Sequence, residues 1–545
     1  MNRKCLVNGV VLACTIGIIP VTALAAPAIP LPGDSITNNE VMPAEGFENT
    51  LPQSEGVDEG LRFTLTGITV EHEGMELADE ELDNQLDYYV SQEIGAAELD
   101  EAVATVTNYA RTHGYPAATA YIPAQTAIDR HLIIRIEPGR YGEVRVENNS
   151  KLDTNIAKGF LGGLKQDQVI KIHSLENALY NLRDIPGIKV AGILSPGEKQ
   201  GTSDLTVRVA DRKQYSFILY SENYGSKSAG RYRYGFQGDY YDTFGNGGKF
   251  TVGLLISNQK QHNYNLSYEM PVGHSATRIG IGFSHADYEL GNVFRALGAE
   301  GKADTWSLYG RTPLWNTSTS SMSFVYGYNF RKITDELSKY NMTWDKHSHS
   351  VNLGFDGFVR GNGSSLTYNV GMTTGTMVPD SDSARAIGEE GGTTGRFTKG
   401  TFDMTGIYAF NPGLDVMLKL SGQKAANNLD SSEHLYLGGA RGVRAYPQGE
   451  ASGDEGILGT IELRYHTKLK GLTLSTYFDA GHVNIGRAGG EGNMTLKGWG
   501  IGVTYVRPND WFLRFDYARR IGGDKLMSAD AQSRQRMWFI LGKIF

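Results

Sequence analysis

The chain has 545 residues, of which 40% are hydrophobic and 21% charged, with 60 acidic against 52 basic side chains. This mildly acidic balance, a net charge of −8, argues against nucleic-acid binding. Both cysteines, Cys5 and Cys14, lie near the start, so disulfides add no stability to the rest of the chain.

Residues 1–25 predict a secretory signal peptide. Arg3 and Lys4 precede an apolar stretch, and the small residues Ala23 and Ala25 supply a cleavage site. Residues 26–60 contain four prolines before residue 45 and then an acidic run, which predicts a flexible linker. Beyond residue 25 no apolar run reaches about 18 residues, so a closed β-barrel is the remaining way to cross a membrane.

Two similar α/β units are predicted next, over residues 61–139 and 140–212. The first begins with a strand at 63–72, continues with helical patterns at 78–93 and 97–113, and ends with a strand at 131–137. The second begins with a strand at 142–148, has helical patterns at 154–163 and 174–184, and ends with a strand at 204–211.

Residues 213–545 have the pattern of a transmembrane β-barrel. All six tryptophans and 22 of the 29 tyrosines lie here, as aromatic girdles at two membrane interfaces require. Apolar and polar residues alternate, for example in WFLRFDYAR, where Trp511, Leu513 and Phe515 oppose Arg514 and Asp516. Counting such segments predicts roughly sixteen antiparallel strands. The last strand ends at Phe545, and a terminal aromatic resembles the assembly signal of outer-membrane barrels.

A glycine-rich segment, GGARGVRAYPQGEASGDEG at 438–456, interrupts this pattern. Its six glycines and one proline exclude a regular strand or helix, and Arg444 lies at its centre. The strand after next, TLSTYFDAGHV, turns Asp479 away from Phe478, so Asp479 faces the lumen if Phe478 faces lipid. The same alternation predicts a luminal wall composed of Glu462, Arg464, Tyr477 and Gly481.

The loop and its aspartate resemble the two-partner secretion transporters of the bacterial outer membrane (TpsB type, the haemolysin secretion/activation family). In that family a long loop folds back into the barrel, which here implies a loop at about 426–456 whose Arg444 meets Asp479. The alternative is an external loop with a solvated Arg444. The remaining residues of the loop motif are Gly438, Gly439, Val443, Tyr446, Pro447, Gly449, Glu450, Gly453, Asp454 and Gly456.

The two α/β units resemble POTRA domains, through Gly114-Tyr115-Pro116, AYIPAQ at 120–125, IEPGRYGEVRV at 136–146 and LENALYNLRDIPGIKV at 175–190. This resemblance implies partner capture at Tyr115, Pro116, Pro123 and Gln125. Two ordinary α/β modules with unrelated roles are the alternative.

The resemblance implies an all-β transmembrane barrel behind two POTRA domains, with the barrel in the Gram-negative outer membrane and the POTRA domains in the periplasm. Such a translocator captures an unfolded, large, β-rich partner protein and secretes it through the barrel. The barrel assembly machinery and outer-membrane lipid are further expected partners, and no enzyme activity, cofactor or metal is expected. A factor that assembles other barrel proteins is the alternative, and a passive porin or adhesin fits the periplasmic units less well.

Two departures from the family pattern and one histidine pair remain. Ala445 stands where the family usually has a glycine, so we expect a slightly different loop tip, because alanine disfavours positive φ. Residues 26–60 lack helical periodicity, so the plug helix of many family members is absent or replaced by a short extended segment. His347 and His349 have the spacing of metal ligands on a strand, but an exposed loop pair is favoured, since no cysteine or acidic cluster is nearby.

Overall fold

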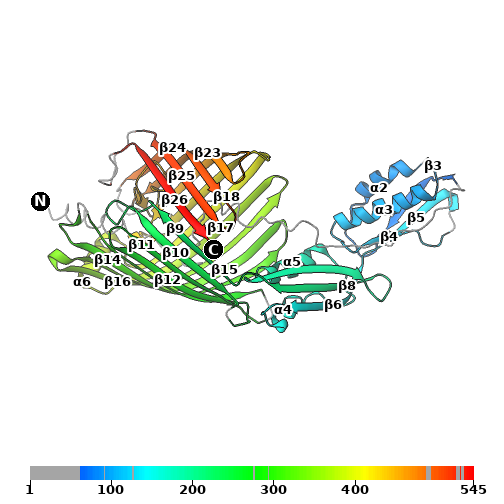
Figure 1. The fold of residues 1–545 in the computed structure, drawn as a ribbon, viewed down its shortest axis with the longest axis horizontal. Coiled ribbons are helices and arrows are strands. Elements are labelled where there is room, and N and C mark those ends of the chain that lie inside the picture. The colour runs from blue at the N-terminus through cyan, green and yellow to red at the C-terminus, as the bar shows by residue number, and fades with distance from the viewer. Residues whose placement is uncertain are drawn as a thin grey trace. The chain divides into compact units, whose positions relative to one another are not determined.

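A computed structural model describes residues 62–90, 92–125, 128–242, 244–273, 276–291, 294–486, 492–522, 528 and 533–545. The predicted signal peptide and linker lie outside these residues. The described chain divides into two compact units between Arg212 and Lys213. Figure 1 shows the first as small α/β elements in blue through cyan to blue-green and the second as a barrel in green to red.

The α/β unit contains two small sheets of the same topology. In the first, β2 (Gly67–Glu71) runs parallel to β5 (His131–Glu137), which pairs antiparallel with β4 (Thr119–Tyr121). In the second, β6 (Arg140–Asn149) runs parallel to β8 (Thr202–Asp211), which pairs antiparallel with β7 (Ile188–Pro196). Two helices separate the first strand of each sheet from the second strand, which is the β-α-α-β-β order that the sequence predicted.

The helices cover their sheets with apolar faces. They are α2 (Asp79–Leu86) and α3 (Ala96–Thr112) in the first half, and α4 (Thr154–Phe160) and α5 (Ile172–Arg183) in the second. In α5, Leu175 and Leu182 are fully buried, and Leu179 packs against the same core. Their spacing places all three on one helical face. The buried residues of the two halves form two separate hydrophobic cores.

The predicted strand at 63–72 is interrupted in the structure. The segment 63–72 is not continuous, because β1 (Phe63–Thr64) leaves it and pairs with β3 (Glu93–Ile94) instead. Leu65, between β1 and β2, is buried in the first core. The apolar alternation therefore continues across a break in the backbone pairing, which the sequence pattern alone does not reveal.

The second unit is a closed barrel of sixteen antiparallel strands, as the sequence predicted. The strands are β9 (Tyr215–Glu222), β10 (Arg233–Tyr241), β11 (Lys249–Ser257), β12 (Gln261–Pro271), β13 (Arg278–Glu289), β14 (Ala299–Asn316), β15 (Ser320–Leu337), β16 (Met342–Gly361), β17 (Ser364–Pro379), β18 (Gly395–Asn411), β19 (Leu414–Ala425), β22 (Glu455–His466), β23 (Leu472–Asn484), β24 (Asn493–Val506), β25 (Trp511–Arg520) and β26 (Gln535–Ile544). Each pairs with its neighbour in sequence, and β26 pairs with β9 to close the barrel.

Side chains on the barrel strands alternate between a polar lumen and an apolar outer face. On β25, Trp511 and Phe515 are exposed on the outside, whereas Asp516 is buried inside. On β22, Ile461 and Leu463 face outward and Glu462 inward. An apolar exterior around charged interior groups suits a barrel surrounded by lipid.

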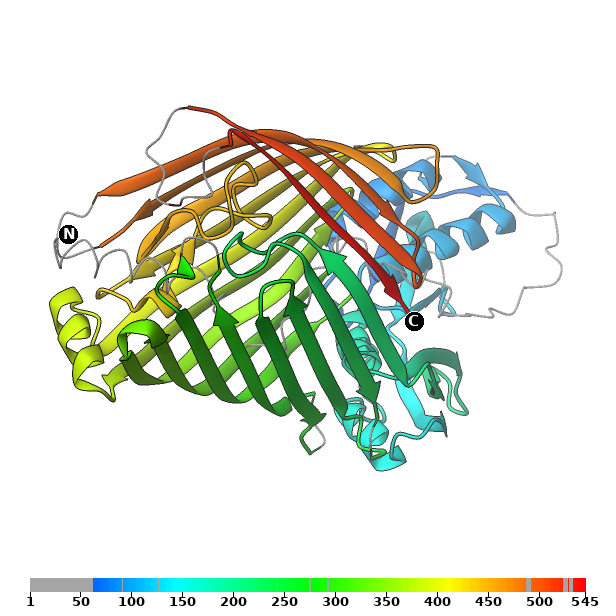
Figure 2. The same cartoon turned by 60° about the vertical axis from the view of Figure 1, so that its left-hand side comes forward.

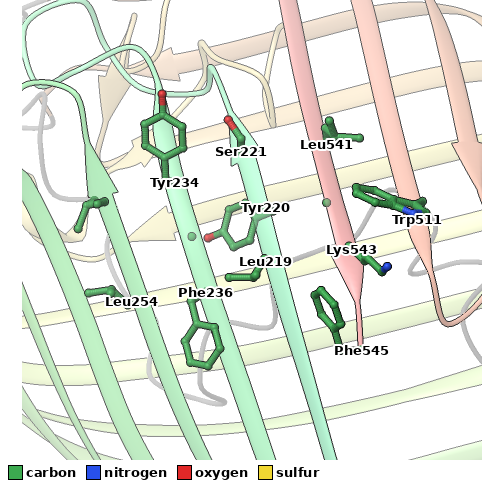
Figure 3. Close-up of a pocket in the computed structure, with 13 residues that line it drawn as sticks. Leu219, Tyr220, Ser221, Tyr234, Phe236, Leu254, Trp511, Leu541, Lys543 and Phe545 are labelled. Atoms are coloured by element: carbon green, nitrogen blue, oxygen red, sulfur yellow. The ribbon is translucent and has the colours of Figure 1, made fainter.

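The seam between the first and last strands is short. Five residue pairs, Ile540–Ile544 against Ile218–Glu222, join β26 to β9. Phe545 extends this pairing, since its N–H donates to the Phe217 carbonyl at 2.8 Å and their rings lie 5.8 Å apart. A hollow of about 460 Å³ lies at the seam, bordered by Leu219, Tyr234, Phe236, Leu541 and Phe545 (Figure 3).

The two histidines of the HSHS segment lie on β16 rather than in a loop, which corrects the expectation from sequence. His347 bonds to Asp380 at 2.8 Å, and His349 bonds to the Tyr328 hydroxyl. In the part of the chain that the structure describes, no group of three potential metal ligands occurs. Within the same residues, no helix is long and apolar enough to cross a membrane.

Candidate functional site

The segment between β19 and β22 lies inside the barrel and contacts its inner wall. It contains the short helix η6 (Ser431–Glu433) and a two-stranded ribbon of β20 (Leu435–Tyr436) and β21 (Ser452–Gly453). Figure 2 shows this yellow-to-orange segment within the barrel. Its tip packs Val443, Ala445 and Tyr446 against Tyr477 and Leu496 of the wall in one buried cluster.

Glycine is required where this loop turns most tightly. Gly438 has no room for a side chain, because a Cβ atom there would lie 2.6 Å from the Pro447 carbonyl oxygen. Gly439 and Gly449 have φ values of +125° and +82°, which other residues rarely adopt. Positive φ also falls on Ala451, whereas Ala445 is not among the residues with positive φ. The alanine at 445 therefore lies in a backbone conformation that alanine adopts without strain.

Ala445 is accommodated by a glycine of the wall. A Cβ atom on Gly498 of β24 would lie only 2.6 Å from the Ala445 Cβ. The wall thus has a notch that receives the methyl group at the loop tip.

Arg444 and Asp479 are in direct contact. Arg444 donates from Nε to Asp479 Oδ2 at 2.9 Å and from Nη2 to Oδ1 at 2.8 Å, which is a bidentate pair. The Arg444 backbone N–H donates to the same carboxylate at 3.0 Å, and Thr460 donates to Oδ1 at 2.9 Å. Asp479 thus holds both the side chain and the backbone of the loop tip.

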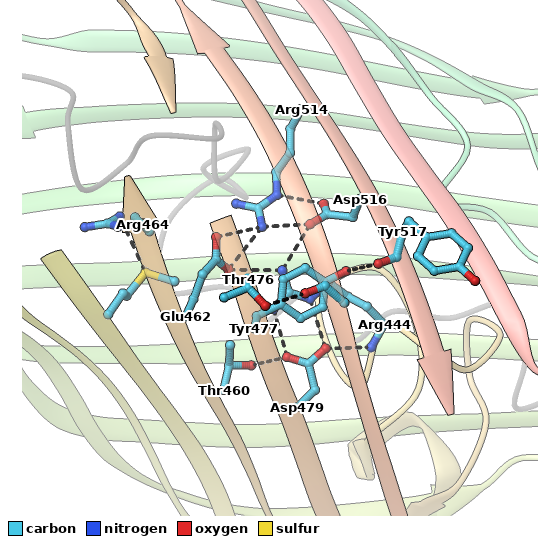
Figure 4. A network of polar contacts seen from close by, with 12 residues as sticks. Arg444, Thr460, Glu462, Arg464, Thr476, Tyr477, Asp479, Arg514, Asp516 and Tyr517 are labelled. Atoms are coloured by element: carbon cyan, nitrogen blue, oxygen red, sulfur yellow. Dashed lines mark hydrogen bonds and ion pairs between the residues drawn. The ribbon is translucent and has the colours of Figure 1, made fainter. Parts of the chain in front are cut away.

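Two further carboxylates and a second arginine complete the cluster. Arg444 Nη1 donates to Glu462 at 3.1 Å and to Asp516 at 3.2 Å. Arg514 donates to Asp516 at 2.7 Å and to Glu462 at 3.1 Å (Figure 4). We call Arg444, Asp479, Glu462, Asp516 and Arg514 the tip anchor.

The remaining groups of Arg444 are also bound to the wall. The Trp538 indole N–H donates to the Arg444 carbonyl at 2.7 Å. The guanidinium carbon lies 3.1 Å from the centre of the Tyr477 ring, a cation–π contact. Four wall strands, β22, β23, β25 and β26, therefore contact this one loop residue.

The tip anchor is buried from solvent. Arg444 is 5% exposed and Asp479 0%. Removing one partner would leave charges buried and poorly compensated, at a typical cost of about 3–5 kcal/mol. Both partners of this ion pair therefore stabilise the bound position of the loop tip.

The other residues of the loop motif shape the loop or fix its ends. Asp454 accepts from the Leu429 N–H at 3.0 Å, and Glu450 accepts from the Ser528 N–H at 3.2 Å. The Gly453 and Gly456 backbones pass close to Asn484 and His482 of β23, leaving no space for a Cβ atom. At Gly481, a Cβ atom would lie 2.8 Å from Leu437, so this wall glycine gives the loop room.

Arg464, expected on the luminal wall, pairs with a different carboxylate. Its Nε donates to Asp415 Oδ1 at 2.6 Å, and His466 Nε2 lies 2.5 Å from Asp415 Oδ2. This ion pair joins β22 to β19, two neighbouring strands of the wall, and does not include the loop tip.

Two of the residues expected to capture a partner have internal contacts instead. Tyr115 is 4% exposed in the core of the first α/β sheet, and its hydroxyl accepts from the Glu76 N–H at 2.7 Å. The Gln125 amide bonds both polar backbone atoms of Ile133, at 2.7 Å to the carbonyl and 2.9 Å to the N–H. Pro116 and Pro123 are half-buried. These contacts give Tyr115 and Gln125 structural roles in the domain, and partner capture at the four residues stays a prediction.

Sequence reasoning missed three members of the site. Arg514 and Asp516 are predicted on the polar face of their strand, but nothing in the sequence links that strand to the loop. Trp538 lies inside the terminal strand, which the sequence marks only as part of the assembly signal. Strand alternation could have placed Trp538 on the luminal face, since it lies between the outward-facing Met537 and Phe539 on β26.

Comparisons with known proteins agree with this architecture. The family model described as haemolysin secretion/activation protein ShlB/FhaC/HecB matches residues 201–505, and the ShlB-type POTRA model matches residues 63–139. Heme/hemopexin transporter protein HuxB from Haemophilus influenzae is 24% identical over 508 residues, covering 91% of this chain and 89% of HuxB. Outer membrane transporter CdiB from Dickeya dadantii is 20% identical over 467 residues, covering 82% and 81%.

Solved structures show the same fold. CdiB from Escherichia coli gives a TM-score of 0.68 at 18% identity and covers 91% of this chain and 93% of that chain. BamA from Haemophilus ducreyi, lacking POTRA domains 1–3, gives 0.53 at 14% identity over 89% and 100% of the two chains.

The secretion-family model spans more than half of the chain, and the POTRA model precedes it in the expected order. The protein therefore belongs to the haemolysin secretion/activation family of ShlB, FhaC and HecB, and is an outer-membrane translocator for a secreted partner protein, with its POTRA region in the periplasm.

Proposed function

We propose that this translocator captures a large, unfolded, β-rich partner in the periplasm and passes it through the lumen when the tip anchor is released. The observation that carries this proposal is the bidentate contact between Arg444 and Asp479, 2.8 and 2.9 Å, deep inside the barrel. A loop bound across the lumen narrows the path, and its attachment by ion pairs is reversible in a water-filled channel.

Capture is assigned to strand edges rather than to individual side chains. In the second POTRA sheet, β7 lies at an edge and offers nine residues of backbone, Ile188–Pro196. An extended partner segment can pair with such an edge, because main-chain hydrogen bonds tolerate varied sequence.

The energy for transit would come from folding of the partner outside the cell. The chain contains no phosphate-binding loop sequence, and no cofactor enters the proposal. The barrel assembly machinery and outer-membrane lipid are proposed partners for insertion of the barrel itself.

Arg444→Ala and Asp479→Ala test the role of the tip anchor. We expect each to reduce secretion of a co-expressed partner protein by about tenfold or more, because transport would need the bound as well as the released state of the loop and each variant destabilises the bound state. The amount of barrel that migrates faster unheated than boiled should remain near wild type. Arg464→Ala is the matched control, since it removes a buried luminal arginine that pairs with Asp415 in the wall. Equal secretion from all three variants would refute a role for the tip anchor.

A further inference from the structure

The first half of the luminal loop carries two carboxylates, the half-buried Asp430 and the buried Glu433. Arg331 Nη1 donates to Glu433 Oε1 at 2.8 Å, and Lys399 Nζ lies 2.8 Å from Glu433 Oε2. Lys346 Nζ donates to Asp430 Oδ2 at 2.7 Å. These three cations belong to β15, β18 and β16, which are different strands from those of the tip anchor. We call these five residues the base anchor.

Three members of the base anchor are buried, and Lys346 and Asp430 are half-buried. Arg331, Lys399 and Glu433 are 8%, 5% and 7% exposed. If Glu433 moved away from the wall, Arg331 and Lys399 would lose their counter-charge. Movement of this part of the loop is therefore unfavourable.

Hydrogen bonds to backbone carbonyls also hold this part of the loop on the wall. Lys399 Nζ donates to the Glu433 carbonyl at 2.9 Å. The Gln423 amide, on β19, donates to the carbonyls of both Glu433 and Asp454 at 3.0 Å. Asp454 immediately precedes β22, so a single wall side chain holds the outgoing and the returning parts of the loop together.

The two anchors have opposite polarity. At the tip, a cation of the loop binds carboxylates of the wall, whereas at the base, carboxylates of the loop bind cations of the wall. In the chain, β20 lies between the carboxylates of the base anchor and Arg444, and its partner β21 follows Arg444. Because the anchors consist of different residues on different strands, loss of one does not by itself remove the contacts of the other.

We propose that the base anchor, positioned by Glu433, is a hinge that keeps residues 430–436 on the wall while the tip is released. The loop would then swing from one side of the lumen instead of leaving the barrel as a whole. The relevance of this motion to secretion rests on the function proposed above. The hinge itself can be tested without any partner protein.

Two cysteine reporters distinguish the halves of the loop. Val443→Cys is the tip reporter, at a position that is fully buried. Ser432→Cys is the base reporter, at a position that is 3% exposed, and a thiol is close in size to the hydroxyl that it replaces. Both native cysteines lie within the predicted signal peptide. The full mature protein is reconstituted in liposomes, and the rate of labelling by a small maleimide is measured for each reporter.

Arg444→Ala should raise the labelling rate of the tip reporter at least about tenfold and that of the base reporter less than about twofold. Glu433→Gln should raise the rate of the base reporter at least about tenfold. Glu433→Asp, which keeps the charge, should give a smaller increase and replaces the glutamine variant if that variant fails to assemble. Glu455→Gln is the control, because Glu455 pairs with Lys424, whose side chain is 74% exposed, and neither reporter should respond.

Equal acceleration of both reporters by Arg444→Ala would show that the loop moves as one piece and would overturn the hinge. Protection of the base reporter in both Glu433 variants would also overturn it. If the tip reporter stays protected in Arg444→Ala, the proposed release of the tip is wrong. The role of Glu433 in holding the base of the loop is then still tested by the base reporter in the Glu433 variants.

Discussion

Arg444 is bound to the wall through both its side chain and its backbone. Its guanidinium contacts three carboxylates, its N–H binds Asp479, and its carbonyl accepts from Trp538. The forked geometry of an arginine permits this number of contacts, since its donors lie in one plane and point in different directions. A lysine would offer the same charge from a single nitrogen.

Arg444→Lys should therefore weaken the tip anchor without abolishing it. We expect a labelling rate of the tip reporter between those of wild type and Arg444→Ala, because an ammonium cannot form the bidentate pair with Asp479. Secretion should follow the same order. A lysine variant that matches wild type in both measurements would show that charge alone holds the tip.

Gln125 has a structural role that can be measured separately from secretion. Gln125→Ala removes two hydrogen bonds to Ile133 and should destabilise the first POTRA domain by about 1–3 kcal/mol. Limited proteolysis of the whole protein should then cut the POTRA region about fivefold faster or more, with the barrel as internal reference. Unchanged proteolysis together with reduced secretion would instead return Gln125 to the role of a capture residue.

Strand alternation predicted the inward phase of Asp479, Glu462 and Arg464, because the side-chain period of two is read directly from the sequence. It did not predict that Asp516 joins Asp479 around Arg444. These residues lie on strands that are separated by β24, and which luminal groups meet across a closed barrel depends on strand tilt and stagger. The base anchor was not predicted either, because Arg331 and Glu433 are far apart in sequence and alternation does not show which luminal groups meet.

At the scale of elements, long periodic segments were predicted better than short ones. The helix α3 and the strand β5 lie where the sequence indicated, since each has a sustained apolar face. The break after Thr64 and the position of His347 on a strand were not predicted. Both depend on pairing with a distant segment, Glu93–Ile94 in one case and β15 and β17 in the other.

The terminal strand gives a prediction at this scale. Phe545→Asp should lower the amount of heat-modifiable barrel in the outer membrane, because Phe545 extends a seam of only five residue pairs and packs on Phe217. Phe539→Ala is the matched control, as it removes an aromatic ring from the same strand while leaving its terminus unchanged. Similar assembly of the two variants would contradict a special role for the terminal residue.

For the whole molecule, secretion requires two states of one loop inside a barrel that does not itself unfold. The wall strands are joined by long ladders, such as the eighteen residue pairs between β15 and β16. The loop is attached to that wall mainly by ion pairs and one apolar cluster. Opening therefore needs to disrupt only these local contacts, and the stability of the barrel need not change.

The most direct test of tip release is a reversible lock on the loop tip that leaves Arg444 and Asp479 intact. Ala445→Cys with Gly498→Cys places two cysteines where the loop meets its notch, since their Cβ positions are 2.6 Å apart and a disulfide needs about 3.5–4.5 Å, a small outward shift. The single variants control for the added side chains. The oxidised double variant should insert normally and secrete almost no partner, and reduction should restore secretion to the level of the single variants. Undiminished secretion by a protein shown to be fully disulfide-bonded would contradict the requirement for tip release.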